Sequence, residues 1–159
     1  MYYIKYFFLT SILGFVLENI ICKNYESGIL YGPWTPVYGI GTMIIIIISN
    51  KVFKKYNLNR ITKYIIIFIS SSLLLSLSEL VGGLLIEKIF RYSFWDYSNH
   101  KYHIGKYVCL EMSILWGIAS LLFVTILKKP LDKIINKIPN FIIYAISIVF
   151  IIDLIYKFF

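Results

Sequence analysis

The chain has 159 residues, of which 59% are hydrophobic and 15% are charged, and its mean hydropathy is +0.77. A soluble domain is roughly 45–50% apolar and about 25% charged, and a small domain cannot bury this much apolar surface in water, so the composition excludes an ordinary soluble protein. The net charge of +8 comes from 16 basic residues that lie mostly between apolar runs, which is typical of membrane topology and anionic headgroup contact and not of nucleic-acid binding.

Five segments are long and apolar enough for a membrane-spanning helix, which needs about 20 residues. They cover residues 3–22, 37–53, 61–90, 107–127 and 141–159. Since lipid offers the backbone no hydrogen bonds, each segment is expected to be helical. The sequence therefore predicts an all-α polytopic membrane protein, a single membrane domain over residues 1–159 with five transmembrane helices and two aromatic outer loops. The first segment has no small-x-small cleavage site, so we interpret it as a span.

The linkers after the second and fourth segments are rich in lysine and arginine. Their basic residues are Lys51, Lys54, Lys55, Arg60 and Lys63, and then Lys128, Lys129, Lys133 and Lys137. The positive-inside rule places both linkers in the cytoplasm, which predicts a cell-membrane protein with its N-terminus inside and its C-terminus outside. We find no nucleotide-binding or catalytic motif. We therefore expect a protein that is not an enzyme, holds no cofactor or metal, and depends on a separate subunit for any ATP hydrolysis.

Five of the eight acidic residues fall within apolar segments, in the halves that this topology places outside. They are Glu18, Glu79, Glu87, Glu111 and Asp153. A carboxylate at the bilayer centre costs about 2.5–3.5 kcal/mol on insertion scales, so these residues indicate a shared polar site. The predicted outer cavity is lined by Glu18, Glu79, Glu87 and Asp96. The alternative is that charges near the helix ends simply reach water.

Small and polar residues follow one face of the first and third segments. They are Ser11, Gly14, Glu18 and Cys22 in the first, and Ser72, Ser76, Glu79, Gly83 and Glu87 in the third. Because small residues let membrane helices approach closely, we predict packing between these helices through Gly14 and Gly83. A sharper interpretation adds a functional carboxylate pair, Glu18 and Glu79, to this contact. Another small-residue face in the fourth segment consists of Ser113, Gly117 and Ser120.

The first outer loop, residues 27–41, is named the proline loop here. Its turn, aromatic and close-approach residues are Gly32, Pro33, Trp34, Pro36, Tyr38, Gly39 and Gly41. The two Xaa-Pro pairs favour turn or extended backbone, and apolar residues flank them. This pattern indicates a re-entrant loop packed into the protein, and a plain interfacial turn is the alternative.

The second outer loop, residues 91–105, is named the tryptophan loop. Its centre is Trp95, Asp96, Tyr97 and Ser98. The spacing of Asp96, His100 and His103 is compatible with a metal site, but a capping or structural Asp96 is the interpretation that we favour. Cys22 and Cys109 lie at the outer ends of their segments, which allows a bridge, although we expect free thiols.

These motifs resemble those of the ABC-transporter type IV family, also called CmpB-like permeases. The residues that carry the resemblance are Gly14, Phe15 and Glu18; Gly28, Gly32, Pro33, Pro36, Tyr38, Gly39 and Gly41; Glu79, Gly83 and Glu87; Trp95, Asp96, Tyr97 and Ser98; and Gly105, Trp116 and Gly117. They span about residues 10–120 in order, and His103 departs from the asparagine that the pattern would place there. The resemblance implies a small bacterial permease-like membrane protein, in which Trp116 and Gly117 serve helix packing.

The sequence leaves three kinds of function open. The first is a permease or transport-associated subunit of unknown substrate, which contacts the lipid bilayer and acts with a separate ATPase or as a homo-oligomer. The second is a membrane scaffold or sensing module without transport, and the third is a membrane enzyme that uses outer-face carboxylates and histidines. We favour the first, with no nucleic-acid partner.

Overall fold

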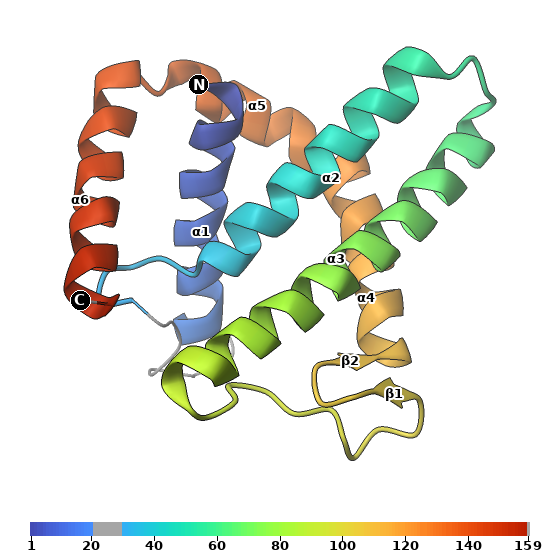
Figure 1. The fold of residues 1–159 in the computed structure, drawn as a ribbon. Helices are drawn as coiled ribbons and strands as arrows, with labels where there is room; N and C mark the ends of the chain where they lie inside the picture. The colour runs from blue at the N-terminus through green and yellow to red at the C-terminus, as the bar shows by residue number, and fades with distance from the viewer. Residues whose placement is uncertain (21–29, 159) are drawn as a thin grey trace. The chain divides into compact units, whose positions relative to one another are not determined.

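The computed structural model describes residues 1–20 and 30–158, and most of them are helical (Figure 1). The chain forms two compact units, which are described separately: unit 1 is Met1–Met43 with Lys128–Phe159, and unit 2 is Ile44–Leu127. The helices are α1 (Tyr2–Ile20), α2 (Pro36–Lys55), α3 (Arg60–Phe90), α4 (Leu110–Leu122), α5 (Lys128–Lys137) and α6 (Asn140–Phe158), with a π-helical turn η1 (Phe123–Leu127) between α4 and α5. The predicted all-α fold is confirmed.

Four helical stretches among the described residues are long and apolar enough to cross a membrane. They are Pro36–Lys54, Arg60–Phe90, Leu110–Lys137 and Asn140–Phe158. The described part of α1, which carries Lys5 and Glu18, is not among them. The chain is thus a multi-pass membrane protein, and the count of five spans stays a prediction.

Two local features differ from the sequence prediction. Residues 103–109 form a small antiparallel ladder, with β1 (His103–Ile104) paired to β2 (Val108–Cys109), and α4 begins at Leu110 and not at the predicted Tyr107. Gly105, which has a φ of 62°, allows the chain to reverse here. The basic linker after the fourth span is also helical, since it forms α5.

In unit 1, the start of α2 packs closely on α1. A side chain added at Gly14 would overlap the ring of Tyr38, and one added at Gly39 would overlap Ser11 and Phe7. The backbone N–H of Thr35 donates to the carbonyl of Ser11 at 3.1 Å. The small residues of α1 therefore accommodate the start of α2, as expected where membrane helices approach closely.

Helix α5 is held against the first turns of α1 by a carboxylate. Asp132 accepts hydrogen bonds from the hydroxyls of Tyr2 and Tyr6, at 2.7 and 2.8 Å, and pairs with Lys128 at 3.0 Å. Lys5 donates to the carbonyl of Ile138 at 2.7 Å. These contacts supply the partners that a half-buried carboxylate needs, so the sequence from 128 to 138 is more than a basic linker.

Unit 2 is built on the contact between α3 and α4. Its apolar core contains Ile48, Val52 and Ile67. Nearer the middle of α3, the hydroxyls of Ser76 and Ser113 lie 2.6 Å apart, and a side chain at Gly117 would overlap Ser72 and Phe68. The predicted small-residue faces of both helices therefore meet each other.

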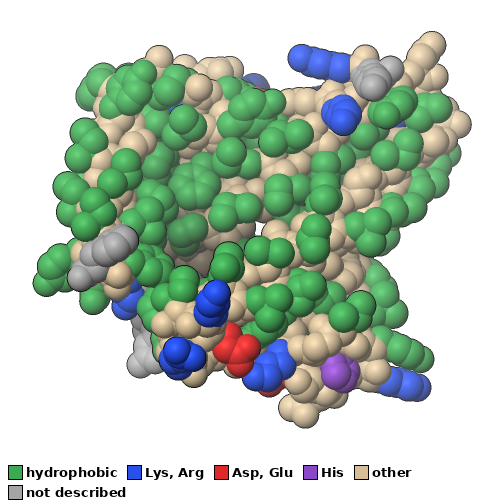
Figure 2. All heavy atoms as spheres, viewed as in Figure 1, with side chains coloured by type: hydrophobic (Ala, Val, Ile, Leu, Met, Phe, Trp, Pro, Cys, Tyr) green, Lys and Arg blue, Asp and Glu red, His purple; other side chains and the backbone are tan. Residues whose placement is uncertain are grey.

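The surface of unit 2 is apolar along its helices and charged at both ends. Figure 2 shows hydrophobic side chains over the helices, with charged side chains at the turn between α2 and α3 and again near the tryptophan loop. Leu73 on the outer face of α3 is 67% exposed. An apolar band between two charged ends is what a lipid-facing unit requires.

Candidate functional site

The buried carboxylate of unit 2 is Glu79, which lies on the α3 face that also carries Ser76 and Gly83. Glu79 is only 8% exposed. Its Oε1 accepts a hydrogen bond of 3.1 Å from the hydroxyl of Tyr97 in the tryptophan loop. An ionisable side chain inside an apolar helical unit is a strong indicator of function, because burying it has a large cost in free energy.

The second carboxylate oxygen of Glu79 has no hydrogen-bond donor of good geometry among the described residues. This oxygen, Oε2, is buried. The indole N–H of Trp116 on α4 interacts electrostatically with the carboxylate, although the two do not form a hydrogen bond of good geometry. Glu79 Oε2 is thus a buried acceptor that a proton, a small cation or a hydrogen-bond donor would satisfy, whereas the Trp116 N–H needs an acceptor.

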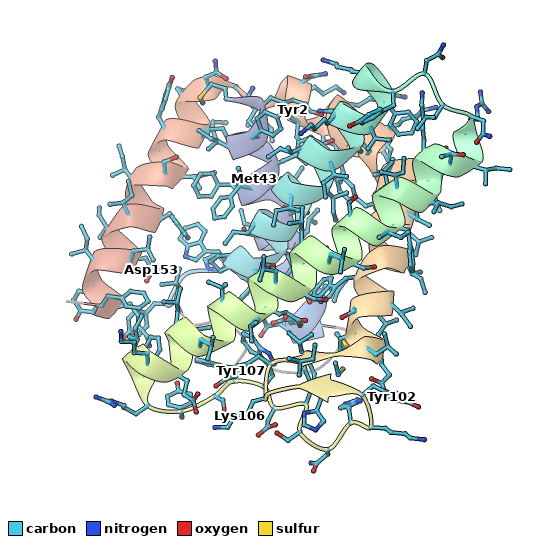
Figure 3. All side chains as sticks on the ribbon, turned by 45° about the vertical axis from the view of Figure 1, so that its right-hand side comes forward. Tyr2, Met43, Tyr102, Lys106, Tyr107 and Asp153 are labelled. Carbon is cyan, nitrogen blue, oxygen red and sulfur yellow. The ribbon has the colours of Figure 1, made fainter. Side chains whose placement is uncertain are left out.

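Tyr107 closes the site from the loop side. Its ring occupies the space that Gly83 leaves open on α3, since a side chain at Gly83 would overlap it. Tyr107 is 2% exposed, and Trp95 stacks edge-on against it with ring centroids 5.8 Å apart. Figure 3 labels Tyr107 and its neighbour Lys106 on the turn between β1 and β2.

The tryptophan loop holds Tyr97 by local hydrogen bonds. The backbone N–H of Tyr97 donates to the carbonyl of Lys106 at 2.7 Å. Asp96 accepts from the backbone N–H of Ser98 at 2.7 Å, and the hydrogen bonds from Ser98 hold the pKa of this exposed carboxyl below its usual range. Burial, and then the neighbouring Glu79, raise the pKa of Tyr97. Asp96 therefore shapes the loop, while Tyr97 reaches the buried carboxylate.

Glu87 stands at the solvent-facing end of the same face of α3. It forms an ion pair with Lys106 at 2.7 Å, and both side chains are more than one-third exposed. This pairing raises the pKa of Lys106. Because exposed ion pairs contribute little stability, the pair serves mainly to tie the loop to the end of α3.

The predicted partner of Glu79 belongs to the other unit. Glu18 is half-buried on α1, and Gly14, one turn earlier, contacts Tyr38 of its own unit, as Gly83 contacts Tyr107 of unit 2. The predicted pairing of Gly14 with Gly83 and of Glu18 with Glu79 stays a prediction. Gly28 and Cys22 lie outside the described residues.

The proline loop is anchored by a residue that the sequence reading left outside the candidate site. Asp153 of α6 accepts hydrogen bonds from the backbone N–H groups of Tyr31 and Gly32 and from the indole of Trp34, at 3.1, 2.8 and 2.7 Å. Trp34 is 6% exposed and stacks edge-on against Phe150. The sequence feature that could have identified Asp153 is its position as an acidic residue within an apolar helix.

The remaining proline-loop residues mark the start of α2. The turn through Gly32 and Pro33 ends at Pro36, the first residue of α2. Proline is well suited to the first turn of a helix because its missing N–H would have no helical partner there. Gly41 is buried within α2.

The comparisons with known proteins agree with the motifs. No curated protein and no solved structure matches this chain. The family described as "Putative ABC-transporter type IV" matches residues 5–159, which is nearly the whole chain. The match extends the resemblance of residues 10–120 through α6 and includes Asp153. The chain therefore belongs to this ABC-transporter type IV family of membrane proteins.

Proposed function

We propose that this protein is a permease-like subunit whose polar site is centred on Glu79. The observation that carries the proposal is that Glu79 is 8% exposed. One of its oxygens is bonded to Tyr97, and the other has no hydrogen bond of good geometry among the described residues. A transporter needs a binding group that is shielded from lipid. Glu79 is shielded, and in this proposal the tryptophan loop that covers it opens to give access from one side.

The chemistry of the site favours a proton or a cationic group as the species that Glu79 binds. Burial disfavours the charged carboxylate, whereas a cation or a hydrogen-bond donor favours it. The tyrosine hydroxyl of the tryptophan loop is such a donor, so movement of Tyr97 would change how readily Glu79 releases its cargo. In this proposal Tyr97 gates the site and Tyr107 shields it.

The wider arrangement completes the proposal. It has five spans with the N-terminus inside. The chain itself is not an enzyme, and a separate ATPase subunit supplies ATP hydrolysis, with the permease-like chain present in one or more copies. Family membership and the lipid-facing helices support this arrangement. Helix α5, with Lys129 and Lys133 exposed, offers the ATPase a basic surface.

The proposal is tested by partner identification and solute analysis. The tagged full chain is crosslinked in its native membranes, and the captured proteins are identified by mass spectrometry. We expect an ATPase subunit with a phosphate-binding loop. A deletion strain should show a changed content of a solute, which the wild-type gene restores and Glu79→Gln does not.

The matched control is Ser78→Ala, at the neighbouring position of α3, where the hydroxyl only bonds the carbonyl of Leu75 within the same helix. This variant should restore the solute content fully. If no ATPase is captured and deletion changes no solute, the protein is a scaffold or sensing module and the proposal fails.

A further inference from the structure

Three side chains with metal-binding groups converge where the tryptophan loop leads into α4. His100 lies in the loop, Cys109 in β2 and Glu111 in the first turn of α4. One ligand atom from each lies within 4.8 Å of the other two, and His100 Nδ1 is 3.7 Å from Glu111 Oε2. From this geometry we propose that His100, Cys109 and Glu111 bind a divalent transition-metal ion of the Zn²⁺ class.

The ligand chemistry selects this class of ion. A thiolate is too soft a ligand for Mg²⁺ or Ca²⁺, whereas an imidazole with a thiolate suits Zn²⁺ and its neighbours. Bonds of about 2.0–2.3 Å to a tetrahedral Zn²⁺ would set the ligand atoms about 3.3–3.8 Å apart. The imidazole and the carboxylate already have this spacing, and the sulfur, which lies within 4.8 Å of both, needs to approach by about 1.5 Å at most.

One of the three ligands is buried and the other two are exposed, which suits a metal site that keeps one position open to solvent. Cys109 is 1% exposed, while the side chains of His100 and Glu111 are 43% and 49% exposed. The sulfur thus lies beneath two ligands that face solvent, and water can occupy a fourth position. Burial raises the pKa of the Cys109 thiol. Binding would therefore release the thiol proton to solvent as the metal–thiolate bond forms.

The backbone holds these ligands in place by contacts of its own. Cys109 is paired with His103 in the β ladder, and Leu110 donates to the carbonyl of Tyr102 at 2.9 Å. The N–H of His100 donates to the carbonyl of Tyr97 at 2.9 Å, and the two rings meet edge-on with centroids 5.6 Å apart. A bound ion would therefore stiffen the turn that carries Tyr97.

The sequence spacing suggested a metal site of Asp96, His100 and His103, but the structure places His100 beside Cys109 and Glu111 instead. Asp96 already accepts a hydrogen bond from Ser98, and His103 Nδ1 lies 2.8 Å from the carbonyl of Gly105. The sequence could not select Cys109 and Glu111, because their approach to His100 depends on the hairpin that β1 and β2 form. The sequence predicted that the protein holds no metal, and the proposed site departs from that prediction. The site does not depend on whether the protein transports a solute.

The test uses the purified full chain in detergent, freed of metal by a chelator. Zn²⁺ is titrated in competition with a chromophoric chelator, and Co²⁺ is added as a spectroscopic probe. We expect one ion per chain and a thiolate-to-Co²⁺ charge-transfer band. Cys109→Ser should abolish the band, and His100→Gln and Glu111→Gln should each weaken Zn²⁺ binding at least about tenfold.

The controls replace a cysteine and a histidine that the proposal does not assign as ligands. Cys22→Ser should leave the charge-transfer band unchanged, and His103→Gln should leave the affinity for Zn²⁺ unchanged. Zn²⁺ should also raise the thermal midpoint of the wild type and not that of Glu111→Gln. Because His100 and Glu111 are exposed, their variants should fold even if Cys109→Ser does not. Wild-type affinity equal to that of both exposed variants, or a Co²⁺ complex without the band, would overturn the proposal.

Discussion

The carboxylate of Asp153 on α6 accepts a hydrogen bond of 2.7 Å from the indole N–H of Trp34, which lies 119 positions earlier in the chain. The same oxygen accepts from the backbone N–H of Gly32 at 2.8 Å. A helix near the end of the chain therefore determines the path of the proline loop. Lys157, one turn along α6, lies over the ring of Tyr31 at 4.6 Å and adds a second attachment.

Asp153→Asn should loosen the proline loop and destabilise the protein. The amide that replaces a carboxylate oxygen would face N–H donors, and losing hydrogen bonds to a charged acceptor costs about 1–3 kcal/mol. We expect a lower thermal midpoint in detergent and a red-shifted tryptophan emission. Asp96→Asn is the control, because its carboxylate accepts one loop hydrogen bond in an exposed position. Equal midpoints for the two variants would contradict the anchoring role.

Glu79 and Tyr97 should be energetically coupled. Each of Glu79→Gln and Tyr97→Phe alters the hydrogen bond between them, so the double variant should lose less stability than the sum of the two single losses. A coupling of about 0.5–3 kcal/mol is typical of such contacts. Chemical unfolding of the four proteins measures it. Strict additivity would show that the hydroxyl of Tyr97 does not contact the carboxylate.

The two adjacent glycines of α3 should respond in opposite ways to alanine. Gly83→Ala places a methyl group against the ring of Tyr107, and such overpacking costs about 1–3 kcal/mol. Gly82→Ala meets nothing within 4 Å and should be neutral or stabilising by up to about 1 kcal/mol, because alanine is the better helix former. Thermal unfolding in one detergent compares them directly. A Gly83→Ala variant as stable as Gly82→Ala would refute the close contact of α3 with Tyr107.

Cysteine labelling in intact cells tests the proposed orientation of the chain in the membrane, with the N-terminus inside. On a Cys22→Ser, Cys109→Ser background, single cysteines are introduced by Asn57→Cys in the turn between α2 and α3 and by Asn99→Cys in the tryptophan loop. A membrane-impermeant maleimide applied to intact cells should modify position 99 and spare position 57, because the basic linker is retained inside. The reverse pattern of labelling would invert the topology.

Much of the fold follows from local patterns. The apolar runs predicted the helices within a few residues, since a backbone in lipid must satisfy its own hydrogen bonds. The periodic placement of Ser72, Ser76 and Gly83 predicted a close-packing face on α3 against the first span. In the structure this face contacts Gly117, Ser113 and Tyr107, and the contact with the first span stays a prediction. Both kinds of pattern lie within one helix, where residue spacing alone determines which side chains share a face.

Which residues contact these helix faces and the unusual acidic residues is determined by the tertiary structure. The sequence marked Glu79, Asp96 and Asp153 as unusual, but spacing does not reveal that Tyr97 reaches Glu79 while Asp96 turns back to Ser98. It also does not bring Asp153 to Trp34, nor His100 to Cys109 and Glu111. Each of these contacts depends on how a loop or a helix folds back on another. Helix formation is local, whereas satisfying a buried polar group depends on which distant segment lies close enough to supply its partner.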